Sequence, residues 1–188
     1  FIFIRNSYAA AAEKLETALA AARDRGYVGT GILNSGFSCD IKIRRGAGDF
    51  LDGESTALPA SMSGRAGEPK SKYIHNTESG YRGKPTILDN VETWVNIPVI
   101  LEKGAPWFAG IGCGDVSESP WKGSSGTKVF SISGDIAKPG LVEVPMGTSL
   151  REIIEDLGGG TAGGRELKAV QIGGPSGGYL PAGMLDTK

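Results

Sequence analysis

The stretch Arg45-Gly46-Ala47-Gly48-Asp49-Phe50-Leu51-Asp52-Gly53-Glu54-Ser55-Thr56-Ala57-Leu58 is the one from which the fold is predicted. It follows residues 39–44, where apolar side chains alternate as in a strand. Its three glycines let the backbone turn tightly and approach a ligand, because no Cβ stands in the way. Glu54 and Thr56 fall where a helix begins, beside backbone N–H groups that have no partner within the helix. The pattern predicts either a cradle for a phosphate or a polar ring edge, or a glycine-rich connection that binds nothing.

The composition is that of a globular protein. Of 188 residues, 39% are hydrophobic and 22% are charged, and the formal net charge is −1. Nucleic acid is bound by clustered basic residues, and a membrane helix needs roughly 18 consecutive apolar residues; the sequence has neither. We therefore expect a globular protein of one domain or two small ones, with no nucleic-acid partner and no membrane-spanning helix. Because the chain begins with Phe1 and not with Met, we expect a fragment of a longer protein.

Metal ligands are scarce in this sequence. Cys39 and Cys113 lie far apart, and His75 is the only histidine. A zinc site or an iron–sulfur cluster needs about four such ligands close together, so we expect no metal site in this chain. A disulfide between the two cysteines is one alternative, and two reduced thiols in a cytosolic protein is the interpretation we favour.

The first part of the chain reads as an alternation of strand and helix. Residues 1–5 predict a short buried strand, and residues 8–25 predict an alanine-rich helix with apolar side chains at helical spacing. We expect Ser7 as the N-cap of this helix and Gly26 at its C-terminal end. Together with the strand over 39–44, this order predicts a parallel βαβ crossover and the α/β fold class.

A polar loop follows the glycine-rich turn. Residues 56–62 predict a short helix limited by Pro59, and residues 63–82 show no periodicity. A loop of this length in a compact domain is usually functional or mobile. It carries Lys70, Lys72, Tyr73 and His75, each of which is either a ligand contact or part of a solvated surface.

A second long helix is predicted over residues 91–101, with an apolar face suited to burial. Asp89 or Asn90 is its expected N-cap, and such polar side chains either cap a helix or contact a ligand. Pro98 predicts a kink or a break. Residues 104–126 are rich in glycine and proline and predict a linker between two units.

The second unit is expected to start near Gly123 and to combine a hairpin, a helix and a strand. In order, we expect strands over 127–136 and 141–144 joined by a turn at 138–140, a helix over 151–157 capped by Thr148, and a strand over 167–172. The run 173–178 is either a tight turn or a ligand contact. This order is typical of a small β-grasp module, and nothing in it indicates catalysis.

Taken in order, these segments resemble the flavoprotein subunit of respiratory complex I and the related diaphorase subunits of NAD-linked hydrogenases and formate dehydrogenases. The resemblance covers nearly the whole chain, and the run 173–178 is closer to the hydrogenase branch. The pieces Gly-Glu-x-Thr-Ala-Leu and Asn-Val-Glu-Thr are specific when they occur together. The matching segments are Phe1–Arg5, Ser35–Phe37, Arg45–Gly48, Gly53–Leu58, Gly83–Thr86, Asp89–Thr93, Ser133–Gly134 and Pro139–Gly140.

The resemblance implies a partial Rossmann-like FMN-binding domain with a linker over residues 1–122, and a ubiquitin-like SLBB β-grasp domain over residues 123–188. Members of this family take a hydride from NADH onto FMN and pass the electrons singly to a 4Fe–4S cluster. We therefore expect an NADH dehydrogenase-type oxidoreductase subunit, with FMN and NAD(H) as cofactors and other redox subunits as partners. The resemblance also implies a cytoplasmic location, peripheral at most on a membrane complex. The cluster cysteines and the family's first glycine-rich FMN loop are absent from this sequence, so the chain is expected to be an incomplete subunit.

The resemblance also implies roles for individual residues. Gly53 and Glu54 would line the FMN and the nicotinamide side, with Glu54 as the catalytic residue. Phe50 would pack beside the isoalloxazine ring. The ribityl-phosphate would be contacted by Asp89, Asn90 and Thr93. The predicted cofactor-binding set is completed by Gly48, Ser55, Lys72 and His75.

Three of these positions depart from the family pattern. Ser55 stands where the family has a second Glu that helps to bind NADH, and a serine cannot replace that charge. His75 stands where an aromatic ring stacks on the adenine, and Asp89 puts a carboxylate where a phosphate would lie. One alternative is therefore a degenerate subunit that docks partners without oxidising NADH. Another is that the β-grasp module binds a small ligand by itself.

Overall fold

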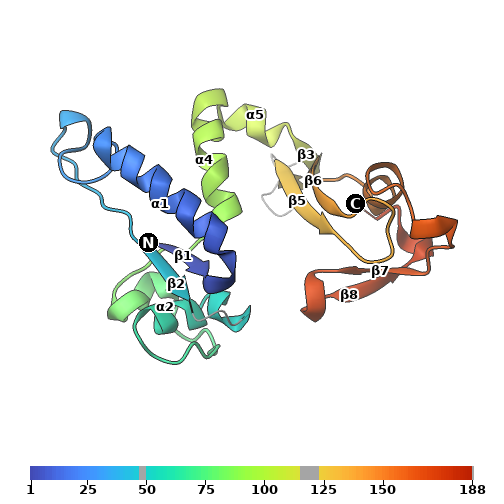
Figure 1. The fold of residues 1–188 in the computed structure, drawn as a ribbon, viewed down its shortest axis with the longest axis horizontal. Helices are drawn as coiled ribbons and strands as arrows, with labels where there is room; N and C mark the ends of the chain where they lie inside the picture. Colours follow the sequence, from blue (N-terminus) through green and yellow to red (C-terminus); the bar gives the residue numbers. More distant parts are fainter. Residues whose placement is uncertain (47–49, 115–122, 188) are drawn as a thin grey trace. The chain divides into compact units, whose positions relative to one another are not determined.

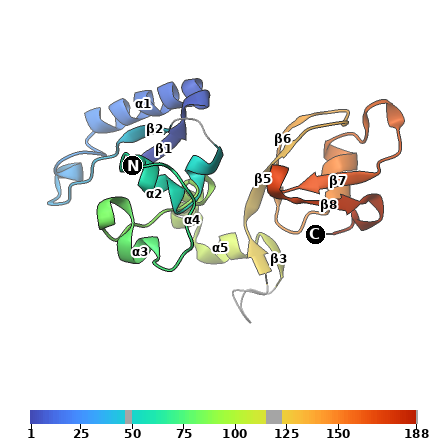
Figure 2. The ribbon, with the colours of Figure 1, turned by 90° about the horizontal axis from the view of Figure 1, so that it is seen from below.

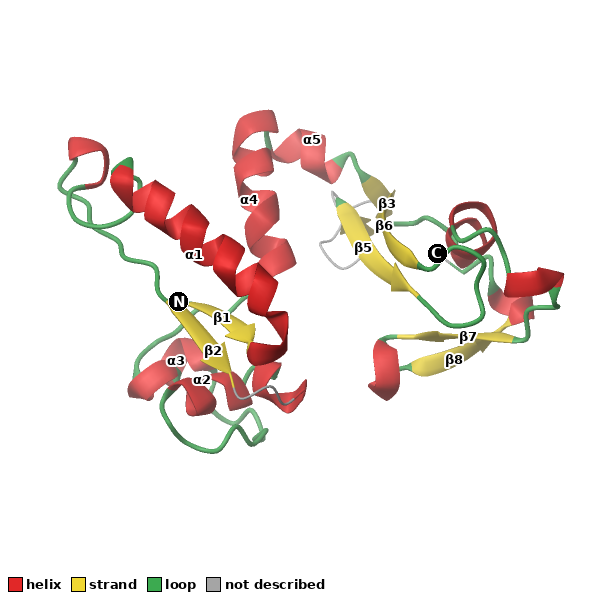
Figure 3. Cartoon of the chain, viewed as in Figure 1, coloured by secondary structure: helices red, strands yellow, loops and turns green. Residues whose placement is uncertain are grey.

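A computed structural model of the chain describes residues 1–46, 50–114 and 123–187. It divides into two compact units, Phe1–Asn90 and Val91–Lys188. Each unit mixes helices and strands (Figure 3). The buried apolar side chains within the described ranges are Ala12, Leu19, Ala57 and Ala60 in the first unit and Val144, Ile153, Ile154 and Leu185 in the second.

The first unit is built on a strand–helix–strand crossover. Strand β1 (Ile2–Arg5) pairs in parallel with β2 (Ile43–Gly46), so that Ile2 lies opposite Ile43 and Arg5 opposite Gly46. Helix α1 (Ala9–Asp24) connects them and lies against the two strands (Figures 1 and 2). It ends as predicted at Gly26, which adopts a left-handed conformation with φ of 71°. The parallel βαβ prediction is confirmed.

Three local expectations in this crossover are wrong. Ser7 does not cap α1, because Asn6–Tyr8 form a 3-10 turn and the N-cap position falls at Tyr8, without a side-chain hydrogen bond. The second strand starts at Ile43 instead of residue 39, since the backbone of Cys39 bridges to Gly29 through hydrogen bonds of 2.7 and 2.9 Å. Strand β1 is half-buried, because within the described residues its sheet has two strands.

After β2 the chain forms short helices. A 3-10 turn (Phe50–Gly53) leads into α2 (Ala57–Met62), which includes Pro59 and is short, as predicted. The expected loop over 63–82 is wrong in its second half. It contains α3 (Asn76–Ser79) and the start of a 3-10 turn (Tyr81–Gly83), held because the Asn76 carbonyl accepts a hydrogen bond from the Thr86 amide at 2.8 Å.

The second unit begins with α4 (Val91–Lys103). This helix continues through Pro98, so the predicted break is absent; one proline removes one N–H donor, and the remaining turns keep the helix intact. Its apolar face is also not buried as predicted, since Trp94 is 53% and Leu101 80% exposed. The predicted linker over 104–126 contains α5 (Ala105–Ala109) and an antiparallel pair, β3 (Gly112–Gly114) with β4 (Gly123–Ser125).

The rest of the second unit holds two hairpins and a helical turn. Strands β5 (Thr127–Ile132) and β6 (Gly140–Pro145) pair antiparallel, and so do β7 (Ala169–Ile172) and β8 (Gly178–Pro181). Glu152–Leu157 form a π-helical turn that buries Ile153 and Ile154. The predicted hairpin, helix and strand are all present, and the run 173–178 forms the tight turn between β7 and β8.

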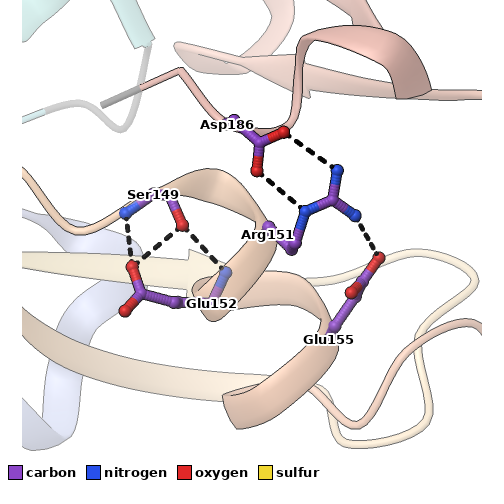
Figure 4. A network of polar contacts seen from close by, with 5 residues as sticks. All are labelled: Ser149, Arg151, Glu152, Glu155 and Asp186. Carbon is purple, nitrogen blue, oxygen red and sulfur yellow. Dashed lines mark hydrogen bonds and ion pairs between the residues drawn. The ribbon is translucent and has the colours of Figure 1, made fainter.

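The helical turn is capped one residue later than predicted (Figure 4). The Ser149 hydroxyl accepts a hydrogen bond from the Glu152 amide at 3.2 Å, and the Glu152 carboxylate accepts one from the Ser149 amide at 2.9 Å. Thr148 is unsuited to this role because its hydroxyl donates to the Pro145 carbonyl at 2.8 Å. Arg151 bonds Asp186 at 2.8 and 3.2 Å, which lowers the pKa of Asp186 and ties the last turn of the chain to the helix.

Glu92 links the first turn of α4 to strand β5 through hydrogen bonds. Its carboxylate accepts a hydrogen bond from the Val129 amide of β5 at 3.0 Å and a second from the Lys128 ammonium. The hydrogen bond from Lys128 holds the pKa of Glu92 below its ordinary value, so the side chain is a carboxylate at neutral pH.

Glu92→Ala is expected to make the Val129 amide hydrogen exchange about fivefold faster, because a hydrogen bond of about 1 kcal/mol is lost. Amide exchange followed by NMR measures this effect. Glu102→Ala, which removes an exposed carboxylate from the last turn of the same helix, is the control and should leave the Val129 amide unchanged. Equal exchange in both variants would contradict the assigned contact.

Candidate functional site

A pocket of about 350 Å³ lies in the first unit, at the start of α2. This volume falls within the range of small-molecule sites, roughly 300–1,000 Å³. The pocket brings together four residues of the predicted site that are widely spaced in the sequence: Ser55, Lys72, His75 and Asp89. The rest of its lining is Thr56, Ile74, Asn76, Thr77, Thr86, Ile87 and Leu88.

Glu54 does not line this pocket but organises one side of it. Its carboxylate accepts hydrogen bonds from the Ser55 hydroxyl at 2.9 Å, from the Thr56 and Ala57 amides at 2.8 and 3.1 Å, and from the Thr56 hydroxyl. These bonds, led by the one from the Thr56 hydroxyl, lower the pKa of Glu54 to about 2. The glutamate thus serves as the cap of α2, where the free N–H groups favour negative charge.

Two hydrogen bonds tie the polar loop to the start of α2. The Thr56 hydroxyl oxygen accepts one from the Lys70 amide at 2.8 Å, and the Asn76 side-chain amide donates one to the Ser55 carbonyl at 2.6 Å. The loop is thereby held on both sides of Lys72, whose ammonium lies 3.9 Å from the Glu54 carboxylate. These contacts explain how Lys72 and His75 come to line the same pocket as Ser55.

The remaining predicted site residues lie elsewhere. Gly48 lies outside the described residues, and so does the side chain of Phe50. Gly53 ends the 3-10 turn, and Asn90 is the last residue of the first unit. Thr93 belongs to the first turn of α4 in the second unit.

Two glycines near the predicted cradle lie close against side chains of the same unit. A Cβ at Gly46 would lie 2.3 Å from the ring of Phe3, and one at Gly67 would lie 2.5 Å from a carboxylate oxygen of Asp52. Gly53 differs, because its Cβ position meets only the Arg5 guanidinium, at 3.8 Å, among the described atoms. Of these three glycines, Gly53 is therefore the one with open space in front of it.

Five residues that line the pocket are absent from the predicted site: Asn76, Thr77, Thr86, Ile87 and Leu88. Asn76 and Thr77 follow His75 directly, and Glu78 accepts a hydrogen bond from the His75 amide at 3.4 Å. A glutamate three residues after a polar residue is a helix-start signal, and it would have indicated α3. Ile87 and Leu88 carry no comparable local signal.

Asp52 is a buried carboxylate beside the pocket-forming turn. It is 6% exposed, and its Oδ2 atom has no hydrogen-bond partner among the described residues. A buried polar atom without a partner destabilises the folded state.

We expect Asp52→Ala to raise the free energy of unfolding by about 1 kcal/mol, because it removes a buried Oδ2 atom that has no hydrogen-bond partner among the described residues. Urea denaturation measures the change. Asp24→Ala, at the exposed end of α1, is the control and should stay within about 0.5 kcal/mol of the parent chain. A destabilised Asp52→Ala variant would contradict this expectation.

A larger hollow, of about 430 Å³, lies between α1 and the approach to β2. None of the predicted site residues lines it. Its charged lining is largely engaged in structural ion pairs, since Arg23 bonds Asp40 at 3.0 Å and Glu16 bonds Arg45 at 3.1 Å. The smaller pocket is therefore the better candidate site.

The described ranges contain no candidate metal site. In residues 1–46, 50–114 and 123–187, no three His, Cys, Asp or Glu side chains gather closely enough to hold a metal ion. Cys39 and Cys113 are both free. No helix within those ranges has the length and apolarity to span a bilayer.

The crossover and its pocket lie within a segment that matches the model of a flavin-binding family. Residues 1–99 match the Nuo51 FMN-binding domain, and residues 129–180 match the SLBB domain. The chain belongs to the Nuo51 FMN-binding family, which confirms the resemblance drawn from the motifs.

Individual relatives match this chain over nearly its whole length. The NADP-reducing hydrogenase subunit HndC of Solidesulfovibrio fructosivorans is 50% identical over 185 residues, which cover 98% of this chain and 36% of that protein. The F subunit of the NADH-quinone oxidoreductase of Escherichia coli K12 is 41% identical over 186 residues, which cover 99% of this chain and 40% of that protein. The chain thus spans well under half the length of these relatives.

The fold is also similar to that of a solved structure. The NAD+-reducing [NiFe]-hydrogenase in its H2-reduced state matches with a TM-score of 0.76 and 34% sequence identity. The match covers 98% of this chain and 29% of the hydrogenase chain.

Proposed function

We propose that this chain is part of an FMN-dependent NAD(P)H:acceptor oxidoreductase subunit, which passes electrons from the nicotinamide through FMN to an iron–sulfur cluster outside this chain. The observation that carries the proposal is the pocket that joins Ser55, Lys72, His75 and Asp89 within the segment matching the Nuo51 FMN-binding domain. Two of the similar proteins are a subunit of an NADP-reducing hydrogenase and a subunit of an NADH-quinone oxidoreductase. Partner redox subunits in a cytoplasmic complex follow from the same proposal.

The residues around the pocket fit a phosphorylated ring system. Lys72 supplies a cation for a phosphate, and Thr77 supplies a hydroxyl. Ile74, Ile87 and Leu88 supply apolar surface against which a flat ring can pack. Bound FMN would supply the redox chemistry, accepting a hydride and releasing electrons one at a time.

The chain's own residues have the task of binding and orienting. Glu54 holds the Ser55–Thr56 turn, and Thr56 and Ser55 in turn hold the loop that carries Lys72. Because its pKa is about 2 and its oxygens already accept four hydrogen bonds, we assign Glu54 a positioning role in place of proton transfer. Of the flavin contacts that the resemblance implies, Gly53, Asp89 and Asn90 belong to the first unit and remain proposed contacts.

The finer fold assignment belongs to the same proposal. A partial Rossmann-like domain over residues 1–122 is supported by the parallel βαβ crossover. A β-grasp domain over residues 123–188 is supported by two antiparallel hairpins, with a helical turn between them in sequence.

Flavin titration of the full gene product tests the proposed function. Quenching of FMN fluorescence should reveal saturable binding at micromolar concentrations or below. The absence of binding at high micromolar FMN would contradict the proposal.

A second candidate is a degenerate subunit that binds partners without oxidising NADH. One contact favours it: the Ser55 hydroxyl, which replaces the family's second Glu, already donates to Glu54 at 2.9 Å. FMN binding without NADH-driven dye reduction by the full gene product would support this alternative. Robust dye reduction would exclude it.

A further inference from the structure

We propose that the loop between α1 and β2, residues 26–39, is a docking surface for another protein subunit and inserts apolar side chains into an uncharged recess of that subunit. The loop lies beyond the C-terminal end of α1 (Figures 1 and 2). The inference rests on the proposed function only for the existence of partner subunits, since no residue of this loop lines the proposed flavin pocket. It goes beyond that function by assigning the surface on which such a partner binds.

The loop exposes three large apolar side chains. Tyr27 is 55% exposed, Leu33 68% and Phe37 64%. Backbone hydrogen bonds bring these three positions together. The Leu33 amide donates to the carbonyl of Gly26, next to Tyr27, at 3.1 Å. The Ile32 amide, next to Leu33, donates to the Phe37 carbonyl at 2.8 Å. A single exposed apolar residue is ordinary, whereas several gathered on one surface mark an interaction site.

Leu33 has a backbone conformation that leucine disfavours. Its φ and ψ are 51° and 35°, in the left-handed region, and Asn34 beside it has a φ of 61°. Asparagine tolerates this region, whereas a leucine there is strained because its Cβ approaches the following carbonyl oxygen. Since Leu33 is exposed, burial within the described residues does little to offset the strain. Strained residues of this kind cluster at binding and functional sites.

The loop is held in this shape before any partner binds. The backbones of Gly29 and Cys39 bridge its two ends through hydrogen bonds of 2.7 and 2.9 Å. The Ser35 hydroxyl donates to the Ile32 carbonyl at 2.6 Å and accepts from the Phe37 amide at 3.2 Å. An ordered loop loses little conformational entropy on association, so more of the free energy of its apolar contacts contributes to affinity.

The charge of the loop indicates which partner it fits. Residues 26–39 contain no Asp, Glu, Lys or Arg, although 22% of the whole chain is charged. Asp24 and Arg25 before the loop carry opposite charges, and Arg23 and Asp40 on its two sides form an ion pair of 3.0 Å. A complementary surface is therefore uncharged and apolar, because a charged group buried against this loop would lose its hydration without gaining a partner. An anionic lipid surface attracts basic clusters, which this loop lacks.

A second copy of this chain fits the loop less well than a different subunit does. The hollow between α1 and β2 is lined mainly by charged side chains, including Glu16, Lys42 and Arg44. The pocket at the start of α2 is the proposed flavin site. Neither offers a free apolar recess, whereas two of the similar proteins are subunits of an NADP-reducing hydrogenase and of an NADH-quinone oxidoreductase.

The first test replaces Leu33 with asparagine, which suits the left-handed backbone but lacks the apolar side chain. The full gene product is purified with its partner subunits, and dissociation of the complex on dilution is followed by mass photometry. Leu33→Asn should raise the dissociation constant about tenfold, while the Tm of the isolated full gene product stays the same or rises because strain is relieved. Leu141→Asn, which changes a leucine that is 75% exposed in β6, is the matched control and should keep the parent affinity.

Oxidative labelling of Tyr27, Leu33 and Phe37 identifies what covers the loop. We expect labelling in the isolated full gene product and protection in the complex. Protection in the isolated monomer would overturn the proposal, because the same polypeptide would then cover the loop. Protection only on concentrating the isolated protein, which indicates a second copy, or only on phosphatidylcholine–phosphatidylglycerol vesicles would overturn it too. So would a loop that is labelled in the complex, or a Leu33→Asn variant with the parent affinity.

FMN titration separates this inference from the proposed function. Leu33→Asn should bind FMN as the parent protein does, because the loop does not line the pocket. A parent protein that fails to bind FMN but protects the loop in its complex would contradict the proposed function and support the docking surface. A full gene product isolated from its native host without partner subunits would overturn the inference, whatever its flavin content.

Discussion

Replacing Glu54 with alanine is expected to lower the free energy of unfolding by about 2 kcal/mol at neutral pH, near the upper end for loss of a helix N-cap. The carboxylate satisfies the Thr56 and Ala57 amides at 2.8 and 3.1 Å, and both would lose their acceptor. The Thr56 hydroxyl, which also accepts from the Lys70 amide, would lose the partner that orients it. The damage should therefore extend from α2 to the loop of the pocket.

The loss of stability in Glu54→Ala is expected to depend on pH. The pKa of Glu54 falls from its ordinary value of 4.5 to about 2 in the folded chain. A carboxyl with a depressed folded pKa contributes stability that is present above its unfolded pKa and is lost as pH falls through the folded value. The difference between the parent chain and Glu54→Ala should thus be largest above pH 4.5 and should shrink down to about pH 2.

Urea denaturation of both chains over this pH range measures the difference. Other acids with lowered pKa values, such as Asp40 and Glu92, are present in both chains and cancel in the comparison. Glu13→Ala, on the exposed side of α1, is the control and should change stability by less than about 0.5 kcal/mol. A difference that did not vary with pH would show that the carboxylate's charge has no part in the cap.

Local patterns in the sequence were sufficient for the parts of the fold that local chemistry controls. Strand patterns at residues 1–5 and 39–44, with a helical pattern at residues 8–25 between them, predicted the parallel crossover. The end of the helix was predicted from Gly26, because glycine readily adopts the left-handed conformation. The hairpin of β5 and β6 followed from a Pro-Gly turn between alternating runs.

The missed details depended on contacts that local patterns do not encode. Thr148 and Ser149 are both good capping residues. Ser149 caps the helical turn, because the Thr148 hydroxyl already donates a hydrogen bond to the Pro145 carbonyl. Strands β3 and β4 are three residues long and rich in glycine, so their sequences look like a linker.

The candidate site could be predicted in part. Family motifs pointed to Ser55, Lys72, His75 and Asp89, and the pocket joins these four. The bonds that assemble them were not predictable, because Asn76 reaches the Ser55 carbonyl across 21 residues and the Lys70 amide reaches Thr56 across 14. The hydrogen bonds of Glu54 were not predictable either, because the motif gives the residue type and does not show which bonds the side chain makes.

Asp89→Asn is expected to tighten FMN binding by about tenfold at low salt, which corresponds to about 1.4 kcal/mol. If the proposed function holds, Asp89 lies where the ribityl-phosphate of the flavin binds, and a carboxylate there repels a phosphate. Asparagine has nearly the same shape but lacks the charge, and its amide can donate a hydrogen bond to a phosphate oxygen. The gain should shrink as salt rises, because mobile ions screen the repulsion that the substitution removes.

Fluorescence titration of FMN with the full gene product, at low and at high salt, measures both effects. Asp24→Asn removes the same charge from the exposed end of α1 and should leave the affinity unchanged. Weaker FMN binding by Asp89→Asn would mean that the carboxylate accepts a hydrogen bond from the ligand, such as one from a ribityl hydroxyl. In that case the negative charge of Asp89 would favour FMN binding. The phosphate would then have to lie nearer to Lys72, in the loop that is held by the hydrogen bond between the Lys70 amide and Thr56.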